Sequence, residues 1–429
     1  MLLIKGGSIV DPIKDKIDKK NIVINDGIIK QFLPLDYPIK YESFEQIIDA
    51  ENMIVVPGLV DMHVHLREPG HEYKEDIRSG TLAALAGGFT DVACMPNTKP
   101  VNDNASVTEF ILRQARLYGY CRVHPIASIS IRQEGKKLTE FGDLKRAGAV
   151  GVSDDGKPVL DSNLMRRALE YANYHGLTVI SHCEDISLSE GGVMHEGIIS
   201  TQLGLPGIPS VSEEILVARD ILLAKLTNCP VHIAHVSTSG SVELIKMAKE
   251  QDIPITAETA PHYFTLDHNA VIGYNTNAKV NPPLRSEDDV EAIKNALKDN
   301  IIDVIATDHA PHSPLEKEVE FDKAEFGIIG LQTAVPLTLN LVREGVLTVT
   351  QAIKKLTVNP AYILGIEAGK IEEGKRADIT IIDPEYSYIL QEDNIYSKSK
   401  NSPFIGMQLK GIVRFTIIKG KIAYSNLNS

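Results

Sequence analysis

Short apolar runs alternate with longer amphipathic segments through the middle of the chain. Runs rich in β-branched residues predict strands, which we expect at 54–65, 89–95, 122–128, 149–154, 177–183, 230–236, 253–259 and 302–308. Between the runs, apolar residues recur at helical spacing, near 75–87, 104–118, 138–147, 161–175, 211–227, 240–251 and 286–298, and helical patterns resume after residue 328. The alternation indicates an α/β protein with a parallel sheet.

The number of repeats favours a closed barrel over an open sheet. Eight predicted strands that alternate with helical segments are the pattern of a (β/α)8 TIM-type barrel. An open doubly wound sheet usually carries a Gly-rich phosphate loop after its first strand. This chain has no such loop, because Gly87 and Gly88 end a helical segment instead.

The two ends of the chain differ from the middle, because both have the pattern of short strands with turns. Asn25-Asp26-Gly27, for example, is typical of a hairpin turn. Neither end alone buries much apolar surface, so we expect them to pack together as one small β-sandwich-like domain. The predicted ranges are 1–56 and 369–429 for this domain and 57–368 for the barrel, with a surface loop at the polar stretch 391–403.

Composition and charge argue against several classes of partner. The chain has 429 residues, 43% of them hydrophobic, and a formal net charge of −13, without the Lys/Arg cluster typical of nucleic-acid binding. No apolar run is long enough to span a bilayer, and Lys5 interrupts the apolar start, so we expect neither a membrane segment nor a signal peptide. The four cysteines form no C-x-x-C pair, as expected of reduced thiols. We therefore expect a cytoplasmic protein that binds neither nucleic acid nor membrane.

The segment Asp61-Met62-His63-Val64-His65 follows a β-like run and carries a candidate metal site. Side chains alternate between the two faces of a strand, so His63 and His65 project together. Imidazole suits zinc and its neighbours among the transition metals. A His-x-His pair alone is weak evidence, and it gains weight from the residues that follow the later strands.

Other residues of types that bind metal lie at the carboxyl ends of other predicted strands, where barrel enzymes place their catalytic residues. They are Asp154 or Asp155 after the fourth strand, His182 after the fifth, His235 on the sixth and Asp308 on the eighth. Such a set exceeds the needs of one catalytic Zn²⁺ and suits two ions joined by a bridging carboxylate.

Some neighbouring residues compete for these positions. Spacing alone leaves the choice between Asp154 and Asp155 open. His232 and His235 face opposite sides of their strand, and we prefer His235 because it lies closer to the carboxyl end. We expect His232 to be packed or hydrogen-bonded. Weaker candidates near strand ends are His124 and His262, whereas His309 follows Asp308 and should point away.

Taken in order along the chain, these residues resemble the cyclic amidohydrolases and, within them, the class I bacterial dihydroorotases. The resemblance covers essentially the whole chain. Its motifs are PGLVDMHVHLREPG at 57–70, MPNT at 95–98, SDDG at 153–156, SHCED at 181–185, HVST at 235–238, NPPLR at 281–285, TDHAPH at 307–312 and FG at 326–327.

The resemblance implies the reversible, metal-dependent hydrolysis of the dihydroorotate ring to N-carbamoyl-L-aspartate, a step of pyrimidine biosynthesis. It implies two Zn²⁺ ions per subunit and six metal ligands, which are His63, His65, Asp155, His182, His235 and Asp308. In this scheme, Asp155 bridges the two ions. Asp308 is also the implied catalytic residue, which takes a proton from the attacking water and passes it to the ring nitrogen.

The substrate contacts implied by the resemblance follow the same motifs. They are His65, Arg67, Asn97, Asn281, His312, Phe326 and Gly327. Arg67 offers a planar fork that pairs with the carboxylate of the ring. Asn97 and Asn281 can add hydrogen-bond donors without adding charge.

The fourth strand departs from the pattern of many relatives, which bridge the metals with a carboxylated lysine. Here the strand end has no lysine, because Lys145 lies in the preceding helix and Lys157 lies past the turn. We therefore expect an aspartate bridge and an activity that does not depend on carbon dioxide.

Two alternatives stay open at this point. The first is another cyclic amidase of the hydantoinase, dihydropyrimidinase or allantoinase type, against which Arg67 argues because those rings lack the carboxylate. The second is a non-catalytic partner of aspartate transcarbamoylase, against which the complete ligand set argues. We expect a homodimer, and the sequence leaves association of an active enzyme with aspartate transcarbamoylase open.

Overall fold

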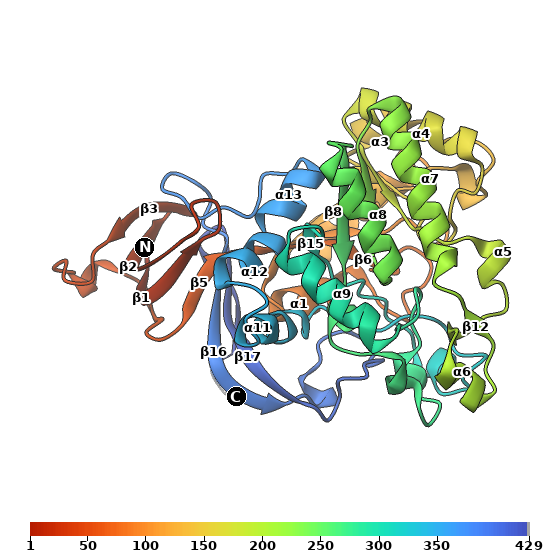
Figure 1. The fold of residues 1–429 in the computed structure, drawn as a ribbon. Coiled ribbons are helices and arrows are strands. Elements are labelled where there is room, and N and C mark those ends of the chain that lie inside the picture. The colour runs from red at the N-terminus through yellow and green to blue at the C-terminus, as the bar shows by residue number, and fades with distance from the viewer. Residues whose placement is uncertain (427–429) are drawn as a thin grey trace.

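The computed structural model describes residues 1–426 and shows two parts side by side (Figure 1). One part is a barrel of strands covered by helices. The other is a sheet built from both ends of the chain.

The barrel consists of parallel strands in the order β6-β7-β8-β9-β10-β13-β14-β15. Their bounds are β6 Leu59–Val64, β7 Phe89–Cys94, β8 Arg122–Ala127, β9 Gly151–Val152, β10 Thr178–Ser181, β13 Val231–Ile233, β14 Ile255–Thr259 and β15 Val304–Ile305. A parallel bridge between Val64 and His309 closes the ring. Beside it, the Asp61 carboxylate accepts a hydrogen bond from Thr307 Oγ1 at 2.6 Å. The predicted (β/α)8 barrel is confirmed.

The predicted strand 54–65 is wrong in its extent, because it consists of two strands in different sheets. β5 (Ile54–Pro57) pairs with strands of the end sheet, and β6 begins the barrel. Gly58 separates them, and a Cβ at this position would lie only 2.3 Å from Thr90 Oγ1. Because only glycine permits such a close approach, the chain passes from one sheet to the other at this residue.

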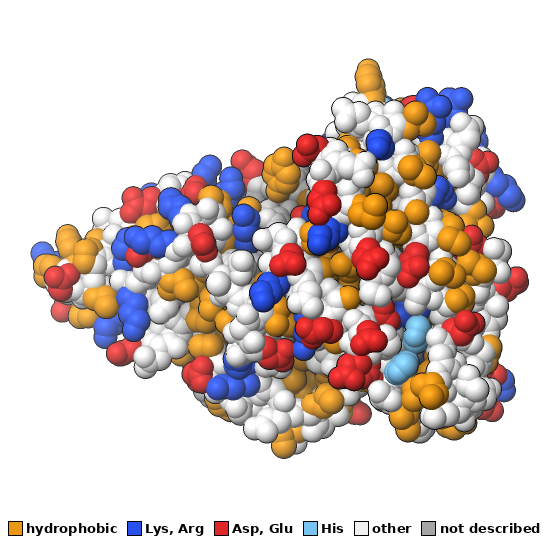
Figure 2. Space-filling model, in the orientation of Figure 1, with side chains coloured by type: hydrophobic (Ala, Val, Ile, Leu, Met, Phe, Trp, Pro, Cys, Tyr) orange, Lys and Arg blue, Asp and Glu red, His pale blue; other side chains and the backbone are white. Residues whose placement is uncertain are grey.

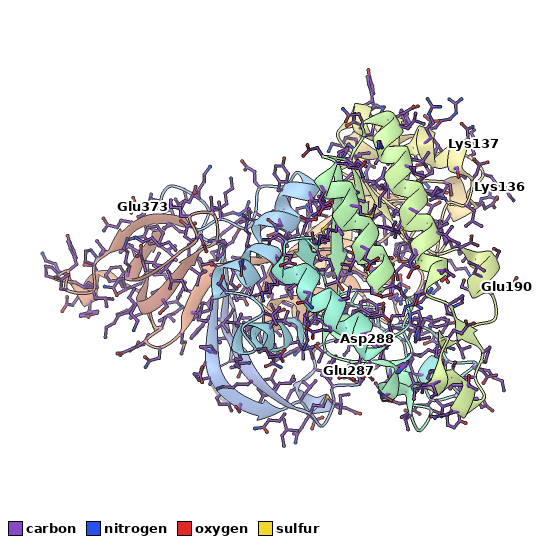
Figure 3. All side chains as sticks on the ribbon, viewed as in Figure 1. Lys136, Lys137, Glu190, Glu287, Asp288 and Glu373 are labelled. Atoms are coloured by element: carbon purple, nitrogen blue, oxygen red, sulfur yellow. The ribbon has the colours of Figure 1, made fainter. Side chains whose placement is uncertain are left out.

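Helices cover the outside of the barrel (Figure 1). Those between its strands are α1 Ile77–Ala86, α2 Ala105–Tyr118, α3 Phe141–Ala147, α4 Ser162–His175, α7 Val211–Thr227, α8 Ser239–Glu250 and α9 Glu287–Lys298. Four more follow β15, namely α10 Pro314–Lys317, α11 Ala334–Arg343, α12 Val349–Lys355 and α13 Val358–Leu364. Figure 3 shows Glu287 and Asp288 in the first turn of α9, where negative charge complements the helix dipole. The predicted helices are confirmed, with small shifts at their ends.

The sequence does not predict the short elements in two long connections. After β10 come α5 Ile186–Ser189, β11 Met194–His195, α6 Ile198–Leu203 and β12 Gly207–Ile208, and after β14 come 3-10 turns at Pro261–Phe264, His268–Val271 and Thr276–Ala278. Elements this short carry no periodic pattern that sequence reasoning can detect.

The end sheet has the order β18-β17-β16-β5-β1-β2-β3, with β4 paired to β1. The bounds of its other strands are β1 Leu2–Asp11, β2 Lys16–Asn25, β3 Ile28–Leu33, β4 Gln46–Asp49, β16 Ile379–Ile389, β17 Gln408–Ile418 and β18 Lys421–Ser425. Residues from both chain ends share one buried cluster, as Ile4 and Ile379 do. Glu373, labelled over this sheet in Figure 3, accepts a hydrogen bond from Phe32 N at 2.8 Å. A β domain built from both ends is confirmed, whereas its boundaries at residues 56 and 368 stay predictions.

The prediction of a surface loop at 391–403 is wrong for its second half, because alternate residues there are buried. Ser397, Ser399 and Asn401 are at most 4% exposed. Ser399 Oγ donates to Lys74 O at 2.6 Å, and Asn401 Nδ2 donates to Ala310 O at 3.1 Å. Polar side chains can be buried when they are hydrogen-bonded, and here the partners are barrel loops. We call residues 397–401 the strap.

Two further observations concern the surface and the thiols. None of the helices within residues 1–426 is long and apolar enough to cross a membrane. Figure 2 shows charged side chains of both signs mixed over the visible face. The four cysteines lie buried as free thiols.

Candidate active site

Three side chains form the first group of candidate metal ligands. His63 on β6 and His65 just after it point inward, because alternate residues of a strand share a face. Asp155, in the loop after β9, lies against both. Its Oδ1 is 3.5 Å from His63 Nε2, and its Oδ2 is 3.5 Å from His65 Nε2. All three side chains are buried, which makes them a compact set of possible ligands.

Asp155 also belongs to a second group, which it shares with two more histidines. Its Oδ1 lies 3.6 Å from His182 Nδ1 and 3.6 Å from His235 Nε2. These two nitrogens are 2.8 Å apart. His182 follows β10 and His235 follows β13, so the carboxylate stands among imidazoles from three strands, where a bridging ligand would have to be.

Asp308, which follows β15, lies beside the first group. Its Oδ1 is 3.1 Å from His65 Nε2 and 3.6 Å from His63 Nε2. Its backbone φ is +46°, an uncommon conformation for a residue other than glycine. The structure therefore brings all six predicted ligands together at the carboxyl ends of the barrel strands.

Two glutamates that were not among the sequence candidates contact His63 and His182, each at the ring nitrogen that faces away from Asp155. His63 Nδ1 lies 2.6 Å from Glu258 Oε1, and His182 Nε2 lies 2.9 Å from Glu184 Oε2. Carboxylates in this position orient metal-binding histidines and select their tautomer. Glu184 belongs to the SHCED motif, which was a usable signal, whereas Glu258 on β14 has no local signal.

The donor set fits a divalent transition metal. Imidazole nitrogen and carboxylate oxygen are both zinc ligands, and His63 Nε2 is buried without a hydrogen-bond partner. Burial alone would raise the pKa of Asp155, but the imidazoles around it hold that pKa well below its ordinary value. At Asp308, too, burial alone would raise the pKa, but the neighbouring imidazoles lower it below its ordinary value. Both side chains are thus carboxylates at neutral pH, the form that binds metal.

The structure shows which member of the pairs Asp154/Asp155 and His232/His235 faces the candidate metal centre. Asp154 faces away from the histidines, because its carboxylate accepts hydrogen bonds from the backbone N–H and the hydroxyl of Ser130. Burial raises the pKa of Asp154 to about 6. His232 is hydrogen-bonded, as expected, with its Nδ1 2.8 Å from Thr256 Oγ1.

The two weaker histidine candidates, His124 and His262, lie outside both ligand groups, and so does His309. His124 stands near the amino end of β8, with Nε2 2.9 Å from Asp91 Oδ1. His309 points away from Asp308, and its Nδ1 accepts from Gly330 N at 3.2 Å. His262 is buried after β14, and its Nε2 has no hydrogen-bond partner.

Arg67, His312 and Lys74 form a cluster of cations and imidazole. Arg67 Nε donates to Pro311 O at 3.1 Å, and its terminal NH2 lies 3.0 Å from His312 Nε2. Lys74 Nζ lies 3.2 Å from the other ring nitrogen of His312. Arg67 and His312 are predicted substrate contacts, whereas Lys74 is not among the sequence candidates.

Asn97 contacts two side chains of the first ligand group, and Asn281 contacts Glu184, the carboxylate partner of His182. The Asn97 amide places Oδ1 2.9 Å from His65 Nδ1 and donates from Nδ2 to Asp155 Oδ2 at 3.3 Å. Asn281 Nδ2 donates to Glu184 Oε2 at 3.0 Å. Both amides thus lie next to the candidate metal centre, and their contact with substrate stays a prediction.

Phe326 and Gly327 lie on the loop between α10 and α11. Gly327 has a φ of +135°, and a Cβ there would lie 3.1 Å from His312 Cδ2, so a side chain would press on that ring. The ammonium of Lys279 lies 4.5 Å from the centre of the Phe326 ring. Lys317 Nζ donates to Gly327 O at 3.0 Å. Two lysines that the sequence analysis does not single out therefore hold this loop.

Comparison with known proteins agrees with this geometry. Residues 54–423 match the Amidohydrolase family. A dihydroorotase of Geobacter metallireducens is 55% identical over 423 residues, which cover 99% of each chain. A dihydroorotase of Pelotomaculum thermopropionicum is 55% identical over 422 residues, 98% of each chain. The chain therefore belongs to the amidohydrolase family and, within it, to the dihydroorotases. It is thus a cyclic amide hydrolase, and the resemblance seen in its sequence is confirmed.

Solved structures of more distant proteins share the fold. The L-hydantoinase (dihydropyrimidinase) of Arthrobacter aurescens superposes with a TM-score of 0.87 at 23% identity, over 98% of this chain and 95% of that one. A dihydropyrimidinase of Brevibacillus agri gives 0.84 at 21% identity, over 99% and 95%. At such identities the likeness concerns the fold alone, and it does not favour a hydantoinase over a dihydroorotase activity.

Proposed function

We propose that this chain catalyses the reversible hydrolysis of dihydroorotate to N-carbamoyl-L-aspartate in pyrimidine biosynthesis. The proposal rests on one observation: the carboxylate of Asp155 lies among two pairs of histidines, and Arg67 follows two residues after one of them, His65. The names of the relatives support the choice of substrate. Arg67 supports it as well, because a ring carboxylate needs a cation to receive it.

We propose two zinc ions per subunit, with Asp155 as the shared ligand. His63, His65 and Asp308 would hold one ion, and the remaining ligands, His182 and His235, would hold the other. When bound, a metal pair supplies an activated water and a Lewis acid that polarises the ring carbonyl.

Asp308 is the proposed catalytic residue. Its carboxylate is ionised at neutral pH and can accept a proton from the attacking water. The same carboxylate then delivers the proton to the ring nitrogen as the carbon–nitrogen bond breaks. In ring closure the carbamoyl nitrogen attacks the carboxyl carbon and gives its proton to Asp308, which passes it to the carboxyl oxygen that departs. With a second proton from solvent, that oxygen leaves as water.

The remaining predicted residues are proposed to bind the substrate. Arg67 and His312 would receive the ring carboxylate, because both can donate hydrogen bonds to it. The other contacts would come from His65, Asn97, Asn281, Phe326 and Gly327.

The assembly is a separate proposal. We infer that the protein is a homodimer. We also infer that it is located in the cytoplasm, a compartment that suits free thiols such as the four buried cysteines. Light scattering on the purified protein measures the oligomeric state. Co-elution with purified aspartate transcarbamoylase tests whether the two enzymes associate.

The activity is tested by offering the purified protein dihydroorotate, hydantoin, dihydrouracil and allantoin. We expect turnover of dihydroorotate alone, loss of activity when a chelator removes the metal, and recovery when Zn²⁺ is returned. Turnover of hydantoin without dihydroorotate would refute the substrate. Full activity in protein shown by metal analysis to be ion-free would refute the metal centre.

A further inference from the structure

The imidazole of His312 stands between two positively charged side chains. Arg67 lies 3.0 Å from Nε2 on one side, and Lys74 lies 3.2 Å from Nδ1 on the other. His312 and Lys74 are only 5% and 9% exposed. Water therefore has little access to the ring, and the protein itself decides which ring nitrogen carries the proton.

The two contacts compete for a single lone pair. A neutral imidazole has one N–H and one accepting nitrogen, whereas an ammonium or a guanidinium can only donate. Lys74 is also paired with Glu316, whose Oε1 lies 3.1 Å from Nζ. With only these groups present, one of the two cations faces an N–H of His312, so the cluster lacks an acceptor.

An anion placed beside Arg67 and Nε2 removes this conflict. A carboxylate there accepts from the guanidinium and from Nε2–H, and Nδ1 is then free to accept from Lys74. The ring carboxylate of dihydroorotate is such an anion.

We propose that Lys74 is a positioning residue for substrate binding, because its hydrogen bond to Nδ1 keeps the proton of His312 on Nε2, where it is donated to the substrate carboxylate. The inference rests on the proposed dihydroorotase activity. Lys74 touches no reacting atom, and it makes the pocket selective for rings that carry a carboxylate.

Hydrogen bonds fix the backbone on both sides of the Lys74–His312 contact, as a positioning role requires. Lys74 N donates to His71 O at 2.9 Å, and the strap residue Ser399 donates to Lys74 O at 2.6 Å. The strap also fixes the other partner, because His312 N donates to Asn401 Oδ1 at 3.1 Å. One segment thus sets the spacing between Lys74 and His312.

The first test compares Lys74→Met with Lys294→Met as a matched control. Lys294 on α9 also pairs with a glutamate, Glu344, at 2.8 Å, but it lies outside this cluster. In Lys74→Met we expect the KM for dihydroorotate to rise about ten- to hundredfold, because a charge-assisted hydrogen bond is lost. We expect kcat to change far less. Lys74→Arg, which keeps a charged donor, should restore part of the affinity.

The second test needs no variant. In ¹⁵N-labelled wild-type protein saturated with N-carbamoyl-L-aspartate, the His312 shifts should show an unprotonated Nδ1 and a protonated Nε2, with the signals assigned by a His312→Gln variant. In Lys74→Met this preference should be lost or reversed.

The outcomes separate the two proposals. Wild-type protein that fails to turn over dihydroorotate would overturn the proposed function. An active wild type whose Lys74→Met and Lys294→Met variants share its KM would overturn the role of Lys74 alone. So would a complex in which Nδ1 of His312 carries the proton, and this result can be read even if Lys74→Met does not fold.

Discussion

At the scale of single residues, the site is defined by which atoms face its centre. Asp155 and Asp154 are neighbours in sequence, yet only Asp155 lies among the histidines, while Asp154 is bonded to Ser130. A one-residue step along the chain therefore separates a candidate metal ligand from a residue that anchors a loop. Function at this site depends on orientation as much as on residue type.

Asp308→Asn should abolish turnover while the protein stays folded. The change removes a side chain proposed both as a metal ligand and as the proton carrier, so we expect kcat to fall by at least about 10³-fold. Steady-state kinetics and thermal unfolding measure the two effects. Asp303→Asn is the control, because Asp303 lies at the other end of β15 and pairs with Lys249 at 2.7 Å. Near-normal rates in Asp308→Asn would exclude its role.

Glu258→Gln should weaken the metal centre without altering any metal ligand. Burial would raise the pKa of Glu258, but His63 and His232 hold it below its ordinary value, so an anion contacts His63 Nδ1. Replacing that anion with an amide should lower metal affinity about ten- to hundredfold. Competition with a chelator measures it, and Glu344→Gln on the outer surface is the control. Equal metal retention in both variants would contradict the prediction.

At the scale of elements, the strap joins parts of the chain that are distant in sequence. It contacts the loop after β6 through Ser399 and the loop after β15 through Asn401. Asn401 alone serves three backbone groups, because its amide accepts from His312 N and donates to Ala310 O and Gly327 O. The C-terminal segment therefore shapes the mouth of the barrel.

Asn401→Ala should destabilise the substrate pocket more than the rest of the protein. The substitution leaves buried backbone groups without partners, each at a cost of about 1–3 kcal/mol. We expect a raised KM for dihydroorotate and faster proteolysis of the loop that contains Gly327. Asn394→Ala, an exposed change in the same connection, serves as the control. An unchanged KM in Asn401→Ala would show that the strap does not position the loop.

At the scale of the whole molecule, ion pairs connect the amino end of the barrel to the end sheet. Asp91 on β7 accepts hydrogen bonds from Arg122 at 2.7 and 2.8 Å. Arg122 also donates to Asp378, which directly precedes β16, at 2.6 Å. One partly buried guanidinium thus ties the two parts of the fold together.

Asp91→Asn should cost about 1.5–3 kcal/mol of unfolding free energy at neutral pH, since Arg122 keeps its second partner. Burial would raise the pKa of Asp91, but hydrogen bonds from His124 and Arg122 hold it below its ordinary value of 3.8. As the pH falls, the unfolded carboxylate is therefore protonated first, so the stabilisation is present above about pH 4 and lost below it.

Urea unfolding between about pH 7 and pH 3 measures this effect. The free energy of unfolding should fall less steeply with acid in Asp91→Asn than in the wild type. Asp143→Asn breaks only an exposed pair with Arg146 and should change the stability by less than about 1 kcal/mol. Parallel acid profiles for wild type and Asp91→Asn would contradict the prediction.

The sequence by itself predicted the barrel and a set of candidate metal ligands at the ends of its strands. Alternation of apolar runs and amphipathic segments is a local property of the chain, so the eight strands and the helices between them could be predicted. His63 and His65 could be paired because strand geometry puts them on one face. Strand ends of a barrel meet at one rim, which is why residues as distant as His182 and Asp308 could be assigned to one site.

Only the tertiary structure decided the arrangements that depend on contacts between distant segments. The passage from β5 to β6 at Gly58 depends on Thr90 and on the end sheet, and nothing near Gly58 in the sequence records it. Glu258 and Lys74 contact the imidazoles of His63 and His312, which are distant in sequence, and their proposed roles rest on these contacts. The polar strap is buried because barrel loops satisfy its hydrogen bonds. Periodicity reports which face of an element is buried, whereas the partner of a polar side chain is set by the packing of the whole chain.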